Sequence, residues 1–395
     1  MRAGRDLRDY AAVEGVVFGL AGDPLGQDFG PAIGQAYDRR GGFIAAGLDP
    51  EDGECALHHD GGACTPPGRL KPRSMTEQKT VRIGTRGSPL ALAQAHYFAD
   101  RITQAAGGQL ATSIHPFTTT GDKILDKPLQ DAGGKGLFTK ELDRAQEMGE
   151  IDVAVHSLKD VTVTLAEHLQ LAAYLPREDP RDCLIGPAST IAGLPQGAIV
   201  GTSSLRRRSQ VLACRPDLKP VTFRGNVQTR LRKLAEGEAQ ATILAAAGLR
   251  RLGMIDKAAG ILSIDEMLPA GGQGIIGVTL HVEAPQWLRE AVAKIDDEDA
   301  RLAAIAERAF LRRLDGSCRT PIAAHFWLTE EGASMAGEVL TDEGDKRWRA
   351  EGMIEGRPTA FDAEVLGNAL AEDVAAERAY DLGEAETPWP EDEEE

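Results

Sequence analysis

The sequence predicts an α/β protein built from two lobes. From Val81 onward, short apolar strands alternate with amphipathic helices, which is typical of α/β sheets. A stretch rich in proline and charge, Pro176 to Asp182, indicates a hinge between lobes. A glycine-rich turn and an apolar strand from Leu268 onward indicate that the chain returns to its first sheet. These three observations together predict two lobes that are connected by two crossings.

Composition limits the classes of protein to which the chain can belong. Its formal net charge of −17 disfavours a general nucleic-acid binder, because such a protein needs a basic face. No run of about 18 apolar residues predicts a membrane-spanning helix. Five irregularly spaced cysteines indicate no disulfide framework and favour a reducing compartment, the cytoplasm. Acidic residues near the start, Asp9 and Glu14, disfavour a signal or transit peptide.

Residues 1–76 differ in composition from the rest of the chain. They are rich in Gly, Pro and Asp and show no sustained periodicity, so we expect a disordered extension or a start site assigned upstream of Met75. CALHHDGGAC, residues 55–64, has the residue types of a zinc site but no predicted fold around it, and we predict no metal site. Residues 386–395 are expected to form an acidic tail.

The first lobe is expected to begin with a strand at Val81–Thr85. Ser88 and Pro89 then predict a helix N-terminus, and polar donors in that turn, Arg86 among them, favour an anion. A second strand is expected in ATSIHPFTTT, residues 111–120. The glycine-rich stretch from Gly121 to Gly136 predicts a long loop that could act as a lid, with Lys135 at its tip.

The stretch IDVAVHSLKD, residues 151–160, is the centre of the first lobe. Its apolar half predicts a short strand, which ends in a polar cluster that includes His156, Lys159 and Asp160. Ligands of open α/β sheets bind at such strand ends. We therefore interpret Asp160 as a candidate acid at a binding site.

Three units of the second lobe each place arginines after a predicted strand. AIVGTSS precedes Arg206–Arg208, VTFRGN precedes a helix with Arg230, and ATILAAAG precedes Arg250–Arg251. Cations at a helix N-terminus oppose the helix dipole, as Arg206–Arg208 would, so an anion is expected to compensate them. Solvated surface arginines are the alternative, but three successive units favour a shared anion site.

A third domain is expected after the second crossing. Glu298–Leu314 predicts an amphipathic helix that ends near Gly316, which places Cys318 in the following loop. Residues 324–340, AHFWLTEEGASMAGEVL, predict a hairpin with a glycine turn, and Pro358–Ala376 predicts a closing helix.

Nine of these stretches together resemble the porphobilinogen deaminase (hydroxymethylbilane synthase) family over about residues 79–380. They are TRGSPLALAQA, GGKGLFTKEL, DVAVHSLKDV, REDPRD, GTSSLRRR, FRGNVQTRL, AAAGLRRLG, PAGGQG and LDGSCRTPIA. Each is weak alone, but all nine in the family's order are specific. The resemblance implies two lobes like type II periplasmic binding proteins, at 77–175 plus 275–294 and at 180–270, and a small α+β C-terminal domain at 297–385.

The resemblance also implies an activity, that of a transferase of tetrapyrrole and haem biosynthesis. Four porphobilinogen molecules would be condensed head to tail, each with loss of ammonia, onto a dipyrromethane cofactor attached covalently through Cys318. Water would then release the linear hydroxymethylbilane. Asp160 is the implied catalytic acid, which would steer the amine's proton and stabilise the cationic methylenepyrrolenine. The implied partners are porphobilinogen and the growing polypyrrole chain, bound by a monomer.

Carboxylates of the cofactor and substrate account for the basic residues, since arginine binds carboxylates at two points. The resemblance assigns cofactor binding to Cys318, Arg86, Ser88, Ser157, Lys159, Asp160, Ser204, Arg206, Arg207, Arg224, Arg230 and Arg251. Lys135 and Gln273 are further candidates for substrate contact. The chain departs from many relatives at Asp131, where they carry lysine, and at Thr162, where they carry proline.

Two other functions fit parts of the sequence. A binding protein of the same two-lobe shape would have no use for Cys318. An acidic scaffold would leave the arginines at the strand ends unexplained. An adduct of two pyrrole rings on the intact protein would distinguish the enzyme from both.

Overall fold

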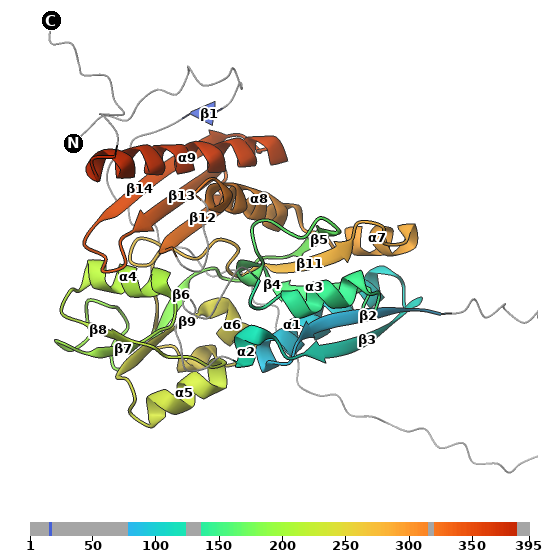
Figure 1. The fold of residues 1–395 in the computed structure, drawn as a ribbon, viewed down its shortest axis with the longest axis horizontal. Helices are drawn as coiled ribbons and strands as arrows, with labels where there is room; N and C mark the ends of the chain where they lie inside the picture. Colours follow the sequence, from blue (N-terminus) through green and yellow to red (C-terminus); the bar gives the residue numbers. More distant parts are fainter. Residues whose placement is uncertain (1–15, 18–77, 124–135, 315–319, 385–395) are drawn as a thin grey trace, which may run out of the picture. The chain divides into compact units, whose positions relative to one another are not determined.

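The computed structural model describes residues 16–17, 78–123, 136–314 and 320–384, all within one unit of the chain. Figure 1 shows their arrangement. The predictions made for the extension up to residue 15 and from 18 to 76, for the motif at 55–64, for Asp131 and Lys135, for Cys318 and for the tail therefore lie outside the described residues.

The first sheet has five strands in the order β3-β2-β4-β11-β5. They are β2 (Lys79–Arg86), β3 (Leu110–Phe117), β4 (Val153–Ser157), β5 (Leu169–Leu175) and β11 (Ile276–His281). β2 runs parallel to β3 and β4, so the C-terminal ends of β2 and β4 share one edge of the sheet. β11 pairs antiparallel with β4 and β5, which confirms that the chain returns to its first sheet.

Helices adjoin this sheet along the chain. α1 (Pro89–Ala105) begins where the sequence predicts, because the Ser88 hydroxyl accepts the Ala91 amide at 3.3 Å, and it buries Phe98 and Ile102. The others are α2 (Thr120–Lys123), α3 (Lys140–Glu147) and α7 (Gln286–Ala293). The expectation of a loop from Gly121 onward is wrong at its start. There, Thr119 donates its amide and hydroxyl to Asp122, which holds one helical turn.

The second sheet also has five strands, in the order β10-β6-β9-β7-β8. They are β6 (Asp182–Ile185), β7 (Ile199–Gly201), β8 (Lys219–Val221), β9 (Ala241–Ala245) and β10 (Gly260–Ile261). Parallel β7, β8 and β9 each precede a helix: α4 (Leu205–Cys214), α5 (Val227–Ala235) and α6 (Ala246–Arg251). This confirms the three units in which arginines follow a strand. β8 ends before Arg224, because the Phe223 amide donates to Ser203 Oγ.

The C-terminal part is an antiparallel sheet covered by two helices. Its elements are α8 (Glu298–Arg313), β12 (Ile322–Leu328), β13 (Gly332–Leu340), β14 (Arg347–Glu355) and α9 (Ala360–Asp381). Figure 1 shows α8 and α9 against the same sheet. The predicted helices and hairpin are confirmed. β14 was missed although charged residues such as Arg347 and Arg349 alternate with buried ones such as Trp348 and Ile354, a period typical of a strand.

A two-residue strand, β1 (Val16–Val17), pairs antiparallel with β14. The sequence pattern of residues 1–76 did not indicate this short strand. The α/β class of the two larger sheets and the α+β character of the C-terminal part are confirmed.

One apolar cluster anchors the strand end that carries Asp160. Leu158 and Val161, which flank it closely, are buried together with Phe310 of α8 and Leu366 of α9. Full burial of a leucine or valine side chain contributes roughly 1.5–3 kcal/mol. The polar end of β4 is thus fixed against the C-terminal domain by its apolar neighbours.

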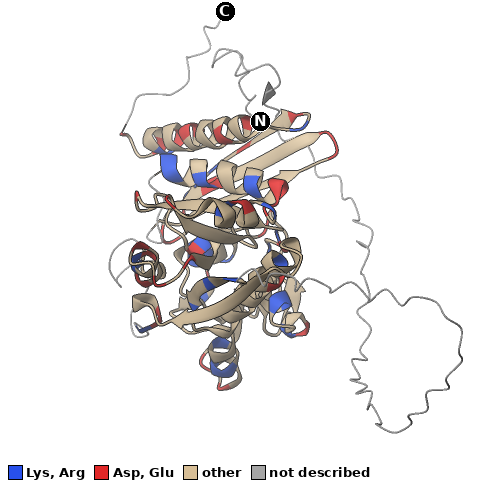
Figure 2. Cartoon of the chain, turned by 90° about the vertical axis from the view of Figure 1, so that its right-hand side faces the viewer, with Lys and Arg blue, Asp and Glu red and all other residues tan. Residues whose placement is uncertain are grey.

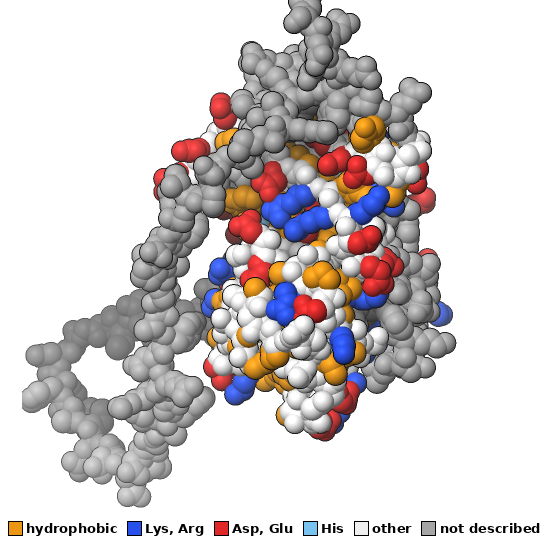
Figure 3. Space-filling view, turned by 90° about the vertical axis from the view of Figure 1, so that its left-hand side faces the viewer, with side chains coloured by type: hydrophobic (Ala, Val, Ile, Leu, Met, Phe, Trp, Pro, Cys, Tyr) orange, Lys and Arg blue, Asp and Glu red, His pale blue; other side chains and the backbone are white. Residues whose placement is uncertain are grey.

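Charges of both signs are interspersed along the described chain. Figure 2 shows basic and acidic positions mixed over most elements, and the face in Figure 3 carries basic side chains beside acidic ones. Arg208 and Glu343, for example, form an ion pair at 2.7 Å. No helix among the described residues is long and apolar enough to cross a membrane.

Candidate active site

The polar residues at the end of β4 lie in different environments. His156 is buried, with Nε2 3.3 Å from the Thr279 hydroxyl, and burial together with the Arg86 charge lowers its pKa to about 4. Its imidazole is therefore neutral near pH 7 and belongs to the packing of the sheet. The Ser157 hydroxyl exchanges hydrogen bonds with Gln94 of α1 and so joins β4 to that helix.

Asp160 lies in a single turn of 3₁₀ helix, η2 (Leu158–Asp160), directly after β4. Its side chain is 32% exposed, and Oδ2 lies 3.6 Å from Nη1 of Arg86 at the end of β2. Arg86 also pairs with Asp122 and lies 4.2 Å from the ring centroid of Phe138. Asp160 is thus a partly exposed carboxylate, and its basic neighbour, Arg86, is shared with Asp122.

Asp122 is a site residue that sequence reasoning missed. Burial by itself would raise its pKa, but hydrogen bonds from Arg86 and Thr119 lower it below the ordinary value. Asp122 therefore stays ionised and holds Arg86 in place. The one available signal was its position at the start of the glycine-rich stretch, where no periodic pattern marks it.

Lys159 is held by a chain of side chains. Its Nζ donates to Gln273 Oε1 at 3.0 Å, and Gln273 Nε2 donates to Asp182 Oδ1 at 2.8 Å. Burial, followed by the charge of Arg207, lowers the Lys159 pKa to about 8. Gln273 is 1% exposed, so it bridges Lys159 to Asp182 across the inside of the site.

Asp182, also missed by sequence reasoning, is the fully buried centre of the arginine cluster. Arg206 Nη2 donates to its Oδ2 at 2.6 Å, and Arg207 Nη2 donates to its Oδ1 at 2.7 Å. Burial alone would raise the pKa of Asp182, but the two arginines hold it far below its usual range. The Nε atoms of Arg206 and Arg207 are buried and have no hydrogen-bond partner among the described residues.

The remaining predicted arginines lie around this cluster. Arg224 Nη2 donates to the Gly121 carbonyl at 3.0 Å, which links the two predicted lobes. Arg230 donates to the Gly225 carbonyl, and burial with the charges of Arg207 and Arg224 lowers its pKa to about 10. Arg251 Nη2 donates to the Gly274 carbonyl at 2.6 Å, beside Gln273.

Two predicted serines cap helices. Ser88 Oγ accepts the Ala91 amide, and Ser204 Oγ accepts the Arg207 amide at 3.4 Å. Each hydroxyl retains a proton that can be donated to an anion. Their positions at the starts of α1 and α4 place these donors at helix N-termini, where negative charge is favoured.

Taken together, these residues form a basic cluster around few acids. Seven basic residues lie around the carboxylates of Asp122, Asp160 and Asp182, and Glu178 also acts on one of the seven, Arg251. The basic residues are Arg86, Lys159, Arg206, Arg207, Arg224, Arg230 and Arg251. Such an excess can bind a ligand with several carboxylates, while Asp160 remains to face a cation.

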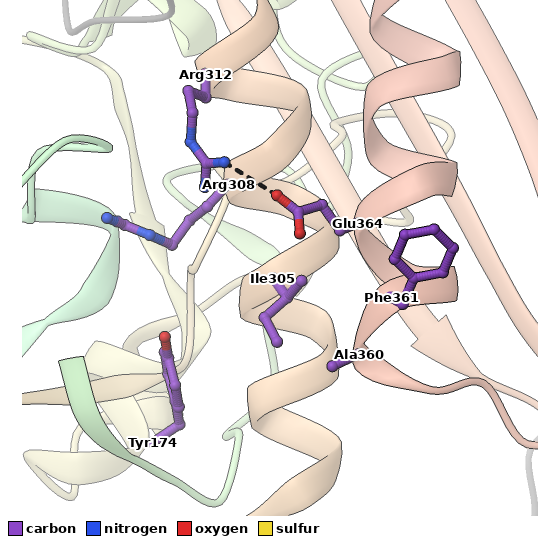
Figure 4. Close-up of a pocket in the computed structure, with 7 residues that line it drawn as sticks. All are labelled: Tyr174, Ile305, Arg308, Arg312, Ala360, Phe361 and Glu364. Atoms are coloured by element: carbon purple, nitrogen blue, oxygen red, sulfur yellow. Dashed lines mark hydrogen bonds and ion pairs between the residues drawn. The ribbon is translucent and has the colours of Figure 1, made fainter. Parts of the chain in front are cut away.

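Two pockets of the described chain lie outside this cluster. One, of about 480 Å³, is lined by the hinge segment 176–180, the start of α8 and β12. The other, of about 320 Å³, is lined by Tyr174, α8 and α9 (Figure 4). Neither is lined by Asp160, and the candidate site rests on the converging charged groups.

Arg308 connects the second pocket to the candidate site. Figure 4 shows Arg312 directed at Glu364, whereas Arg308, one turn earlier on α8, is directed away from it. The buried Arg308 guanidinium donates to three successive carbonyls, those of Val161, Thr162 and Val163, at 3.3, 2.7 and 3.0 Å. The backbone that follows Asp160 is therefore held by α8.

The resemblance implies that Asp160 is the catalytic acid. Arg308→Met is therefore expected to lower kcat/KM at least about ten-fold, because freeing these carbonyls lets Asp160 shift, and small misplacements are costly in catalysis. Arg312→Met, which removes only an exposed ion pair on the same helix, is expected to leave kcat/KM nearly unchanged. Steady-state kinetics of both variants, with amide exchange at Val161–Val163, provide the measurement. Equal kinetics in the two variants would contradict a role for Arg308 in positioning Asp160.

Comparisons with known proteins point to one family. A family model described as the porphobilinogen deaminase cofactor-binding domain matches residues 81–288, and the model of the C-terminal domain matches residues 301–376. Porphobilinogen deaminase of Paracoccus denitrificans is 49% identical over 307 residues, which are 77% of this chain and 96% of that protein. The chloroplastic porphobilinogen deaminase of Oryza sativa is 53% identical over 270 residues, 67% of this chain and 75% of that protein.

Among solved structures, a TRAP periplasmic solute binding protein from Desulfovibrio salexigens matches with a TM-score of 0.38 and 11% identity, over 79% of this chain and 99% of that one. This likeness is too weak to carry an argument. The first family model alone spans more than half of the 395 residues. The relatives are matched over most of their length. The chain therefore belongs to the porphobilinogen deaminase family.

Proposed function

We propose that the basic cluster around Asp160 is where this chain carries out the family's reaction. The chain is a hydroxymethylbilane synthase: it condenses porphobilinogen molecules on a dipyrromethane cofactor with loss of ammonia. The observation that supports the location is the partly exposed Asp160 carboxylate, 3.6 Å from Arg86 and surrounded by an excess of basic residues. A ligand with several carboxylates and a cationic amine matches both features.

The residues present fit a dipyrromethane group. Its acetate and propionate groups need donors, and the buried Nε–H groups of Arg206 and Arg207 have no partner among the described residues. Lys159, Ser88 and Ser204 provide further donors at the same strand and helix ends. When bound, dipyrromethane supplies the primer to which pyrrole units are added. We assign its attachment to Cys318, which lies outside the described residues.

Asp160 is proposed to act on the substrate's aminomethyl group. Its carboxylate can hold the ammonium while the carbon–nitrogen bond breaks and ammonia leaves with the bonding electron pair. It then stabilises the positive charge that remains on the pyrrole. The basic residues meanwhile hold the substrate's carboxylates, and Arg86, shared with Asp122, holds Asp160 in place. One carboxylate can serve each addition in turn, because ammonia loss is the same in every cycle.

The finer organisation is also part of the proposal. We assign lobes to 77–175 plus 275–294 and to 180–270, and a third domain to 297–385, which is supported by the membership of the three sheets. We further propose a monomer in the cytoplasm. The few, irregularly spaced cysteines, among them the buried Cys183 thiol, support a reducing compartment. Sedimentation analysis would test the oligomeric state, and a stable dimer would contradict it.

Intact-mass measurement tests the proposed function directly. Protein purified from cells that make porphobilinogen is expected to exceed the polypeptide mass by two pyrrole units, and peptide mapping should place the adduct on Cys318. Cys318→Ser is expected to lack the adduct, while Cys214→Ser, a change at an exposed thiol, should keep it. A wild-type protein without any adduct would defeat the proposal.

A further inference from the structure

We infer that Asp182 is a positioning residue that orients Arg206 and Arg207 for carboxylate binding and, through Gln273, holds Lys159 in place. This inference rests on the proposed function. The comparisons assign no role to Asp182. It is the first residue of β6, and it is distant in the sequence from every residue that it positions.

The geometry around Asp182 leaves the two guanidinium groups little freedom. Each arginine uses one terminal nitrogen on Asp182 and the other on a backbone carbonyl: Arg206 on Leu268 at 2.5 Å, and Arg207 on Ile243 at 2.9 Å. Two acceptors from different segments therefore hold each planar fork. Nε is the guanidinium nitrogen of each arginine that has no described partner.

Burial makes this arrangement depend on the carboxylate. Arg206 and Arg207 are each 5% exposed, and Asp182 is fully buried. Two adjacent buried guanidinium groups repel each other, and a single carboxylate between them offsets that repulsion. The trio keeps one net positive charge, so it still attracts an anion while its members stay in place.

Gln273 extends the effect of Asp182 to Lys159. Its amide donates to Asp182 Oδ1 and to the Pro180 carbonyl, which directs its oxygen to Lys159 Nζ. Four charged groups act on the ammonium: Arg207 and Arg206 lower its pKa, whereas Asp160 and Asp182 raise it. Asp182 therefore helps to keep Lys159 protonated near neutral pH, in the form that binds carboxylates.

Asp182→Asn tests the inference without changing the size of the side chain. Asparagine can accept a hydrogen bond from one arginine, but its NH₂ faces the donor of the other. We expect kcat/KM to fall at least ten-fold, mainly through KM. We also expect the pKa of Lys159 to fall below its value of about 8. Pulse labelling of lysines with acetic anhydride across pH 6–10, read by peptide mass spectrometry, measures that pKa in the purified enzyme.

Asp217→Asn is the matched control. Asp217 also pairs with an arginine of the second lobe, Arg215, at 2.7 and 2.8 Å, but it has no contact with the cluster. It is expected to leave both KM and the labelling of Lys159 unchanged. If Asp182→Asn gave the same KM and the same Lys159 labelling curve as this control, the inference would be overturned.

Gln273→Met provides a second test if Asp182→Asn does not fold. It keeps both arginine–Asp182 pairs and removes the hydrogen bonds of the Gln273 side chain to Lys159, Asp182 and Pro180. The Lys159 pKa should therefore fall while the adduct on Cys318 is retained. An unchanged Lys159 labelling curve in this variant would overturn the link through Gln273. Failure of the proposed function can be distinguished from failure of this inference, because the wild-type protein would then lack the adduct.

Discussion

Asp160→Asn is expected to lower kcat by about 10²–10³, since removing one preorganised charged group from a reaction centre typically costs that much. The substitution keeps the size of the side chain, and Leu158 and Val161 still anchor the turn. The fold and the binding of carboxylates should therefore persist, with the loss in kcat rather than in KM. Single-turnover measurement of ammonia release and pyrrole coupling provides the test.

Asp152→Asn is its matched control. Asp152 stands just before β4 and pairs with Arg82 of β2, as Asp160 follows β4 and pairs with Arg86 of β2. Asp152→Asn is expected to lower the free energy of unfolding by about 1 kcal/mol and to leave kcat nearly unchanged. If Asp160→Asn turned over porphobilinogen as fast as Asp152→Asn, the catalytic assignment would have to be abandoned.

Glu307→Gln is expected to cost about 3–5 kcal/mol of unfolding free energy, as is usual when one partner of a buried ion pair is removed. Glu307 is fully buried on α8 and binds Arg177 Nη1 at 2.6 Å and the amides of Gly272 and Phe326 at 2.6 and 2.8 Å. It thus joins the hinge, the second crossing and β12 at one point. Urea unfolding followed by circular dichroism measures the loss.

The stabilisation that Glu307 provides is expected to decrease as the pH falls. Burial alone would raise the pKa of Glu307, but Arg177 and His325 lower it below its ordinary value of 4.5. The stabilisation is therefore fully present above about pH 4.5, and it is lost as the pH falls through the folded pKa. The difference between wild type and Glu307→Gln should shrink in acid.

Glu343→Gln is the control for this prediction, because Glu343 is exposed and pairs with Arg208 on the surface. It should change the unfolding free energy by less than about 1 kcal/mol at any pH. Glu307→Gln with an unfolding curve like that of Glu343→Gln would show that the buried pair does not hold the three segments together.

The sequence by itself determined the elements and the chemistry of single positions. Apolar periodicity located most strands and helices correctly, because which side chains are buried depends on a repeat of two or 3.6 residues that is visible locally. Motifs placed Asp160 at the end of β4 and Arg206–Arg208 at the start of a helix, and both placements are confirmed. β14 was overlooked although its charged residues alternate with apolar ones at the period of a strand.

Only the tertiary structure decided how these residues are connected. Lys159 and Gln273 are 114 residues apart, and Gln273 and Asp182 are 91 apart. Arg308 reaches Thr162 across 146 residues. A local pattern reports on neighbours within a turn or a strand, whereas these contacts form where separate strand ends meet. Asp182 therefore had no local signal, and Asp122 had only its position at the start of the glycine-rich stretch. Neighbouring arginines keep both carboxylates ionised against the effect of burial.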